Sequence, residues 1–252
     1  MALKRIMPCL LFDGRALVKT VRFRNPGYIG DPINAIKIYN EKEVDELVFL
    51  DINASREKRS PRFDFVRECA SECFMPFSYG GGVRSVDDFA RLYRIGVEKV
   101  LVNTLSLTNP EIVREAVRQY GSTSVVGSVD YKKALLGGKR VYSASGASTK
   151  RSVVDHCRFL ANDVGVGELL LYSVDRDGTW TGFDLETIRE VGAAIGVPLI
   201  ACGGAGSVAH LREVLEHTPA NAAALGSMAV YQKKGMGVLI NFPRRQLVIG
   251  ED

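Results

Sequence analysis

The sequence has little of what marks a membrane, secreted or metal-binding protein. No apolar run approaches the roughly 18 residues that a membrane-spanning helix requires. There are three histidines and one tryptophan, and the five cysteines follow no zinc or redox spacing. An odd cysteine count without a secretory signal pattern indicates reduced thiols. We therefore expect a cytoplasmic protein that uses no metal or cofactor and has no membrane partner.

The charged residues also lack the clustering that nucleic-acid binding requires. The 33 lysines and arginines exceed the 29 acidic residues by a net charge of +4, and the basic residues are scattered along the chain. A nucleic-acid interface concentrates them in a patch or stripe, whereas a diffuse excess favours anionic small ligands only weakly. The hydrophobic fraction of 46% is that of an ordinary globular protein. We therefore expect no nucleic-acid partner.

What the sequence does contain is a regular alternation of apolar runs and amphipathic segments. The apolar runs are IMPCLLF, ELVFLDI, FMPFSYGG, KVLVNT, SVVGSVD, ELLLYSVD, VPLIACGG and NAAALGS. Such runs suit strands of a parallel sheet that is covered on both faces. Amphipathic patterns predict helices over 61–72, 86–95, 110–119 and 185–195, the third starting at Pro110 with Asn109 as its cap. The alternation indicates a (β/α)8 barrel or a long doubly wound sheet.

An internal repeat decides between these two folds. The stretch FSYGGGVRSVDDF (77–89) is similar to IACGGAGSVAHL (200–211), and the strands that follow keep nearly the same offset. Two halves of four βα units close naturally into a barrel, whereas a Rossmann-type sheet has no reason to repeat both glycine turns. We therefore predict one domain over residues 1–252, an α/β fold of the (β/α)8 TIM-barrel type built from two similar half-barrels.

In such a barrel, functional residues collect where the strands end. Glycine turns at 80–82 and 203–206 follow two predicted strands, and each is followed one βα unit later by small or polar residues, at 103–104 and 226–227. Glycine lets the backbone approach a ligand, and amides at a helix start bind phosphate. The pattern predicts two phosphate half-sites, although glycines that only tighten the turns would give the same pattern. A loop over 140–150, rich in serine and glycine, suits phosphate contact as well.

Carboxylates also stand at predicted strand ends. Asp130 closes the run SVVGSVD, so its side chain is expected in the barrel mouth. A dry pocket raises the pKa of a carboxyl group and makes it a candidate general acid or base, whereas a helix cap or a loop hydrogen bond is the alternative. Asp51, Asp175 and Asp177 are weaker candidates of the same kind. The histidines, at positions 156, 210 and 217, have no ligand spacing and are interpreted as packing or surface residues.

A second charged group stands at the opposite ends of the strands. Two cations and two anions each directly precede or open an apolar run: Arg5, Glu46, Lys99 and Glu168. Charged residues at strand entrances are usually solvated. If these four pointed inward, they would form a ring across the barrel bottom, which is tolerable only when the charges pair with one another.

The sequence resembles a known family over residues 4 to about 230. The stretches KRIMPCL, DELVFLDINAS, GGGVRS, NTLSLTNPE, GELLLYSVDRDGT and CGGAGS are similar to HisF, the cyclase subunit of imidazole glycerol phosphate synthase. Members of that family bind a substrate with two phosphates and take ammonia from a glutaminase docked on the barrel bottom. The resemblance implies a substrate site made of Lys19, Asp51, Gly82, Asn103, Thr104, Asp177, Gly178, Gly204, Gly226 and Ser227. It also implies that the four charged residues at the barrel bottom are an ammonia gate.

The sequence departs from the cyclase pattern where the chemistry takes place. The family uses one catalytic aspartate at the end of the first strand and a second one that Asp130 matches, but Leu11 occupies the first place in CLLFDGR. Leu101 and Tyr172 stand where the family has small hydroxyl residues. The terminal stretch VYQKKGMGVLINFPRRQ also lacks the long last helix of ordinary cyclases. Asp13 belongs to the later DGR triplet and is not an obvious substitute for the missing acid.

These departures resemble the WbuZ branch of the family, the glycosyl amidation-associated proteins. The stretches that carry this likeness are PCLLFDGRALVKTVRF, YIGDPINAIKIYNEKEVDEL, ECFMPFSYGGG and VLINFP. The resemblance implies an ammonia-handling subunit that serves amidation of a surface-polysaccharide or lipopolysaccharide sugar, with a HisH-like glutaminase at the N-terminal face and a sugar amidotransferase as partners. Two alternatives stay open: an authentic cyclase of histidine biosynthesis, and a non-catalytic scaffold that binds a phosphorylated effector and activates the glutaminase.

Overall fold

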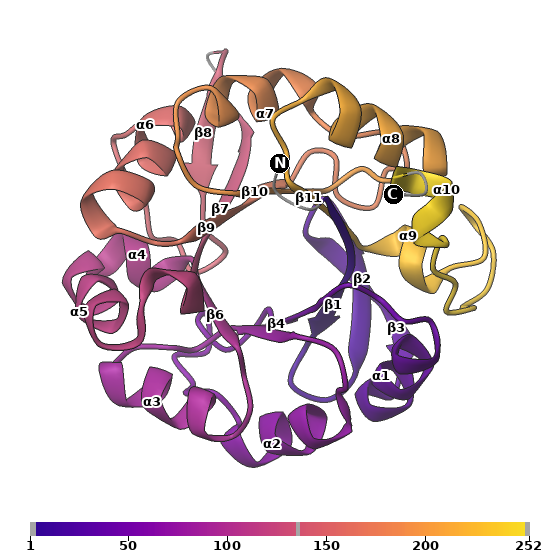
Figure 1. Ribbon diagram of the computed structural model, residues 1–252, viewed down its shortest axis with the longest axis horizontal. Helices are drawn as coiled ribbons and strands as arrows, with labels where there is room; N and C mark the ends of the chain where they lie inside the picture. Colours follow the sequence, from indigo (N-terminus) through magenta and orange to yellow (C-terminus); the bar gives the residue numbers. More distant parts are fainter. Residues whose placement is uncertain (1–3, 135–136, 250–252) are drawn as a thin grey trace.

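The barrel is closed by eight parallel strands. The computed structural model describes residues 4–134 and 137–249. Each barrel strand pairs with the next, and the last pairs with the first, with Arg5 opposite Ala222. Helices surround this ring (Figure 1), so the (β/α)8 prediction is confirmed. The barrel strands are β1 (Arg5–Phe12), β4 (Leu47–Asp51), β5 (Phe77–Gly80), β6 (Lys99–Val102), β7 (Val125–Lys133), β9 (Glu168–Ser173), β10 (Leu199–Cys202) and β11 (Ala222–Leu225).

The outer helices follow the amphipathic segments closely. They are α1 (Pro32–Glu41), α2 (Phe63–Glu72), α3 (Val86–Arg94), α4 (Thr104–Thr108), α5 (Pro110–Tyr120), α6 (Val153–Arg158), α7 (Leu185–Gly192) and α8 (Val208–His217). A 3-10 turn (Ser122–Ser124) follows α5, and a π-helical stretch (Phe159–Val164) continues α6. Asn109 is the N-cap residue of α5, as expected, but its side chain forms no capping hydrogen bond. Asn109 also ends α4, where its amide donates to Leu105 O over 2.8 Å, so Pro110 begins α5 without that cap.

The internal repeat has a structural counterpart in the helix caps. The serine that follows each glycine turn caps the next helix, because Ser85 Oγ accepts from Asp88 N and Ser207 Oγ accepts from His210 N, both over 3.2 Å. Each glycine turn is thereby fixed between a strand end and the first turn of a helix. The two half-barrels therefore repeat the same serine helix cap as well as the same order of strands.

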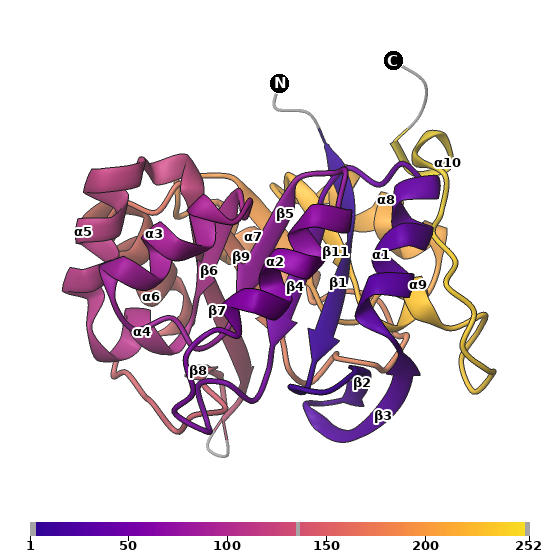
Figure 2. The same cartoon turned by 90° about the horizontal axis from the view of Figure 1, so that it is seen from below.

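Three strands outside the barrel were not predicted. β2 (Leu17–Val21) and β3 (Arg24–Gly30) form an antiparallel hairpin after β1, and β8 (Lys139–Tyr142) pairs antiparallel with β7. All three lie at the end of the barrel opposite the two chain termini (Figure 2). The hairpin turns at Arg22 and Phe23, whose φ angles of 54° and 58° are left-handed. That geometry normally selects asparagine or glycine.

After β11 the outer ring is irregular. Between β11 and residue 249 the chain forms α9 (Ser227–Val230), an isolated bridge between Tyr231 and Val238, and α10 (Arg245–Ile249). Arg245 pairs with Asp45 over 3.1 Å, and this segment covers the outside of the barrel between α8 and α1 (Figure 1). Within the described part of the chain, no helix is long and apolar enough to cross a membrane.

The barrel interior is divided into layers along its axis. A charged layer lies at the amino ends of the strands. Above it is an apolar layer whose side chains are fully or almost fully buried, namely Met7, Val48, Val126, Leu170, Ile200 and Ala222. At the carboxyl ends the interior opens into a cavity. The strands thus place an apolar layer between the charged residues and the cavity.

Candidate functional site

The cavity at the carboxyl ends of the strands holds one part of the predicted site. Its apolar lining includes Leu11, Leu50, Leu101, Phe23 and Tyr172. Five of the predicted site residues line it: Asp51, Gly82, Asn103, Thr104 and Asp130. The other predicted substrate-binding residues, at positions 19, 177, 178, 204, 226 and 227, do not line it. The structure therefore separates the two expected half-sites.

Asp130 is the carboxylate that the cavity leaves free. Burial raises the pKa of Asp130 to about 7, and the like charge of Asp177 acts in the same direction. No donor within residues 4–134 or 137–249 forms a hydrogen bond with its carboxylate, so the expected alternative of a cap or loop contact does not apply. A carboxyl group with a pKa near neutrality can both give and accept a proton at physiological pH. Asp130 is thus placed for general acid or base catalysis.

The first half-site surrounds the turn at Gly82. Gly82 has a left-handed φ of 73°, and a Cβ atom there would lie 2.5 Å from Arg59 O, so both conformation and space require glycine. Its amide donates to Ser55 Oγ over 3.4 Å. The Ser55 hydroxyl oxygen thus lies where the Gly82 amide would otherwise donate to a phosphate oxygen. An anion at this turn stays a prediction, and the structure shows one backbone donor, Gly82 N, directed at a hydroxyl oxygen there.

Hydroxyl groups from two loops complete this half-site. Thr104 Oγ1 lies 3.1 Å from Ser145 Oγ and 3.3 Å from Ser143 Oγ, and Asn103 Nδ2 donates to Ser128 O over 3.1 Å. Both loop serines line the cavity. The sequence signalled them only through the serine-rich composition of the loop over 140–150. Ser55 carried no signal of its own.

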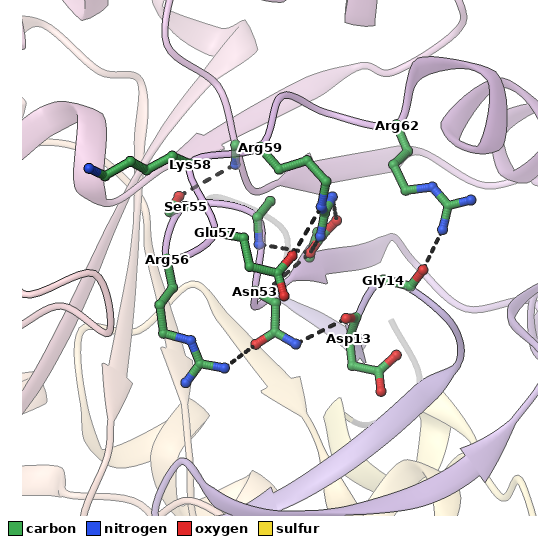
Figure 3. Close-up of polar contacts among 12 residues, drawn as sticks. Asp13, Gly14, Asn53, Ser55, Arg56, Glu57, Lys58, Arg59 and Arg62 are labelled. Atoms are coloured by element: carbon green, nitrogen blue, oxygen red, sulfur yellow. Dashed lines mark hydrogen bonds and ion pairs between the residues drawn. The ribbon is translucent and has the colours of Figure 1, made fainter.

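Asp51 organises a loop and leaves little carboxylate free for a ligand. It accepts two hydrogen bonds from Arg59, at 2.8 and 3.1 Å, and one from Ala54 N at 3.0 Å. The bonds to Asp51 raise the pKa of Arg59. Figure 3 shows Arg59 among the polar residues of this loop. Asp13 has a similar role, since its Oδ1 accepts from Arg15 N and Ala16 N at 2.8 and 2.9 Å. Both carboxylates are thus engaged within their own loops.

The second half-site is covered by the β2–β3 hairpin. Asp177 is 5% exposed, and its carboxylate accepts from Thr20 Oγ1 at 2.7 Å, Phe23 N at 3.1 Å and Tyr172 OH at 2.9 Å. Its carbonyl accepts from Arg22 N at 3.0 Å. Gly178, with φ 67°, lies so close to Thr20 O that a Cβ atom would overlap it. Asp177 and Gly178 therefore hold the hairpin turn in this structure.

Lys19 belongs to β2 of the same hairpin, and its side chain is buried. Its Nζ donates to Cys9 O, and burial lowers the pKa of Lys19. A Cβ atom on Gly226 would be 3.6 Å from this Nζ, so the lysine is near the predicted half-site at Gly226 and Ser227. Ser227 begins α9, and Gly204 packs against Gly182 O. The structure thus brings Lys19 close to Gly226, and none of these four residues lines the open cavity.

We predict that Tyr172→Phe loosens the hairpin. The change removes one donor from a buried carboxylate, which costs about 1–3 kcal/mol. The free energy of opening measured by hydrogen exchange at the Arg22 and Phe23 amides should fall by that amount. Tyr142→Phe is the matched control, because the Tyr142 ring also contacts Phe23 at 6.1 Å between centroids. Equal exchange in both variants would contradict this role of the Tyr172 hydroxyl.

The four charged residues at the opposite end form one closed network. Glu46 accepts from Arg5 at 2.6 Å and from Lys99 at 2.9 Å. Glu168 pairs with the same two cations, with Lys99 at 2.9 Å. Ser78 Oγ donates a further bond to Glu46 over 2.6 Å. Cations and anions alternate around the barrel, so each carboxylate contacts both cations.

Comparison with known proteins agrees with this architecture. The family described as Histidine biosynthesis protein matches residues 5–235. A Pseudomonas aeruginosa protein, provisionally named imidazole glycerol phosphate synthase subunit hisF2, is 46% identical over 96% of this chain and 97% of its own length. The imidazole glycerol phosphate synthase subunit HisF of Streptococcus sanguinis is 44% identical over 90% of each chain. The chain therefore belongs to the histidine biosynthesis protein family and is a HisF-type, cyclase-type synthase subunit.

Proposed function

We propose that this chain is the synthase subunit of a glutamine amidotransferase that has given up the cyclase reaction and delivers ammonia for amidation of a surface-polysaccharide sugar. The observation that carries the proposal is Leu11. It lines the cavity at the end of β1, where the family resemblance implies a catalytic aspartate. Asp130 remains, so one of the two expected acids is present.

The missing acid bears directly on the cyclase chemistry. Addition of ammonia to the ketone, ring closure and scission of the nucleotide require proton transfers on both faces of the substrate. Loss of one positioned acid or base costs about 10²–10⁴ in rate. The other carboxylates near Leu11 are held by a guanidinium or by backbone amides. Leu11, Leu101 and Tyr172 also make the cavity more apolar than a polar nucleotide would favour.

Ammonia delivery is supported by the charge network at the other end of the barrel. The four residues that the resemblance assigns to an ammonia gate are all present and all paired. They lie between the N-terminal face and the apolar interior layer. A HisH-like glutaminase docked on that face would release ammonia next to the network, and a neutral ammonia molecule can enter an apolar interior that excludes ions. A sugar amidotransferase would then use the ammonia.

A cyclase assay on the purified chain tests this proposal. With saturating ammonium salt and the ribulosyl aminoimidazole carboxamide nucleotide, we expect turnover at least about 100-fold below 1 s⁻¹, the lower end of ordinary enzyme rates. Ammonia from solution removes the need for a glutaminase. The Streptococcus sanguinis relative, assayed in parallel, shows that substrate and conditions are sound. Turnover near 1 s⁻¹ would sink the proposal.

The second candidate function is the authentic cyclase of histidine biosynthesis. It is favoured by Asp130, whose pKa of about 7 suits proton transfer, and by the relatives named imidazole glycerol phosphate synthase subunit. The cyclase assay distinguishes the two candidates directly. A non-catalytic scaffold is distinguished by Asp130→Asn, which would leave every activity of the complex unchanged.

A further inference from the structure

We infer that Arg56 is a specificity-determining residue that binds a second anionic group, phosphoryl or carboxylate, of the ligand whose phosphate occupies the Gly82 turn. The inference rests on the proposed phosphate site at that turn. It names a substrate class, a phosphorylated molecule with a further acidic group nearby. A neutral sugar phosphate would use the turn alone.

Arg56 stands beside the phosphate half-site but points in another direction. Ser55 and Arg56 are neighbours on the loop after β4, and both line the cavity. The Ser55 hydroxyl accepts from Gly82 N, whereas the Arg56 side chain runs away from it toward Asn53 (Figure 3). A phosphate at the turn and an anion at Arg56 would therefore occupy different places in one cavity.

The charge of Arg56 is not neutralised within the described part of the chain. The acids closest to it on this loop, Asp51 and Glu57, both pair with Arg59, at 2.8 and 3.1 Å. Arg56 donates from Nη2 to the neutral Asn53 Oδ1 over 2.8 Å. An arginine that lines a cavity without a carboxylate partner is suited to an anion supplied by a ligand.

The guanidinium is also held in place. Asn53 Nδ2 donates to Asp13 O over 3.0 Å, which fixes the amide that binds Arg56. A guanidinium has five N–H donors in a planar fork, so donors remain after the bond to Asn53. Such a fork binds a carboxylate or a phosphoryl group through two parallel hydrogen bonds, and a partly fixed fork loses less entropy on binding. The loop thus presents an exposed guanidinium, held by one side-chain hydrogen bond, at the rim of the cavity.

Binding measurements with three small probes test the inference. Isothermal titration calorimetry at low ionic strength would compare glycerol 3-phosphate, 3-phosphoglycerate and 2,3-bisphosphoglycerate. The protein should bind at least one of the two doubly anionic probes about tenfold more tightly than glycerol 3-phosphate, and Arg56→Gln should remove that advantage. Preference between 3-phosphoglycerate and the bisphosphate distinguishes a carboxylate from a phosphoryl group. Lys58→Gln is the matched control, because it removes the same charge from the same loop outside the cavity lining.

Each outcome is decisive. Loss of the advantage in Arg56→Gln but not in Lys58→Gln supports the inference. Equal losses in the two variants would show a general effect of charge, which 0.5 M salt would abolish, and would overturn it. Binding of glycerol 3-phosphate that is unaltered by a second anionic group overturns the inference but leaves the phosphate site standing. Absence of all binding overturns both.

Discussion

Glu168→Ala is expected to lower the free energy of unfolding by about 3–5 kcal/mol, because removal of one partner leaves a buried charge uncompensated. In the structure Glu168 is 5% exposed and pairs with both Arg5 and Lys99. Without it, two cations share Glu46 at the bottom of the barrel. The cost comes from the two partly buried cations that remain, whose side chains are 20% and 21% exposed, rather than from the strength of the lost bonds.

Urea unfolding at neutral pH would measure this loss. Glu186→Ala is the matched control, since Glu186 also pairs with a lysine, Lys139 at 2.9 Å, but its side chain is 76% exposed. An exposed pair contributes at most about 1 kcal/mol. A loss for Glu168→Ala no larger than that of the control would mean that water reaches the network and that the charges are solvated.

Asp130→Asn is expected to stabilise the protein at high pH and to remove proton transfer by this carboxyl group in the cavity. The folded-state pKa of about 7 lies above the unfolded value of about 3.9. A raised carboxyl pKa means that the folded state holds a proton that the unfolded state releases. The wild type therefore loses stability as the pH rises from about 4 to 7, by about 2–4 kcal/mol in all, and the loss is complete above pH 7. Asparagine carries no charge, so the Asp130→Asn variant avoids this loss of stability.

Chemical unfolding at pH 4.5 and pH 8 would test the sign of this effect. The stability advantage of Asp130→Asn should grow between the two values, while any ammonia-dependent reaction in the cavity falls by about 10²–10⁴. Asp177→Asn is the control, because three donors hold that carboxylate and the same change should be destabilising. An advantage that does not vary with pH would show that Asp130 does not titrate near neutrality.

The fold could be predicted from the sequence because its signals are local and repeated. Continuous apolar runs mark strands covered on both faces. The paired glycine turns at 80–82 and 203–206 favour a barrel of two similar halves over a doubly wound sheet. The charges at the strand entrances could be identified from position alone. Whether these side chains point inward depends on the stagger between strands in the closed barrel. The sequence of a single strand does not reveal that stagger.

The hairpin could not be predicted, and the state of the second half-site depends on it. Arg22 and Phe23 are poor candidates for a left-handed turn, so the local sequence argues against the structure that forms. Contacts from Asp177, distant in sequence, hold both turn amides and override that preference. Because the hairpin was not foreseen, Asp177 was expected to face a ligand, whereas here its carboxylate faces the hairpin.

The charge network also constrains the order in which the chain can fold. Arg5 and Glu168 are 163 residues apart in the sequence, and β1 waits for β11 before the sheet closes. The first half-barrel leaves the ribosome with both cations of the network, Arg5 and Lys99, and only Glu46 to pair with them. Contacts of such long range slow folding, and the N-terminal half emerges first. Although the two halves repeat one another in sequence, the first half lacks its second carboxylate until β9 supplies Glu168, and the sheet closes only when β11 pairs with β1.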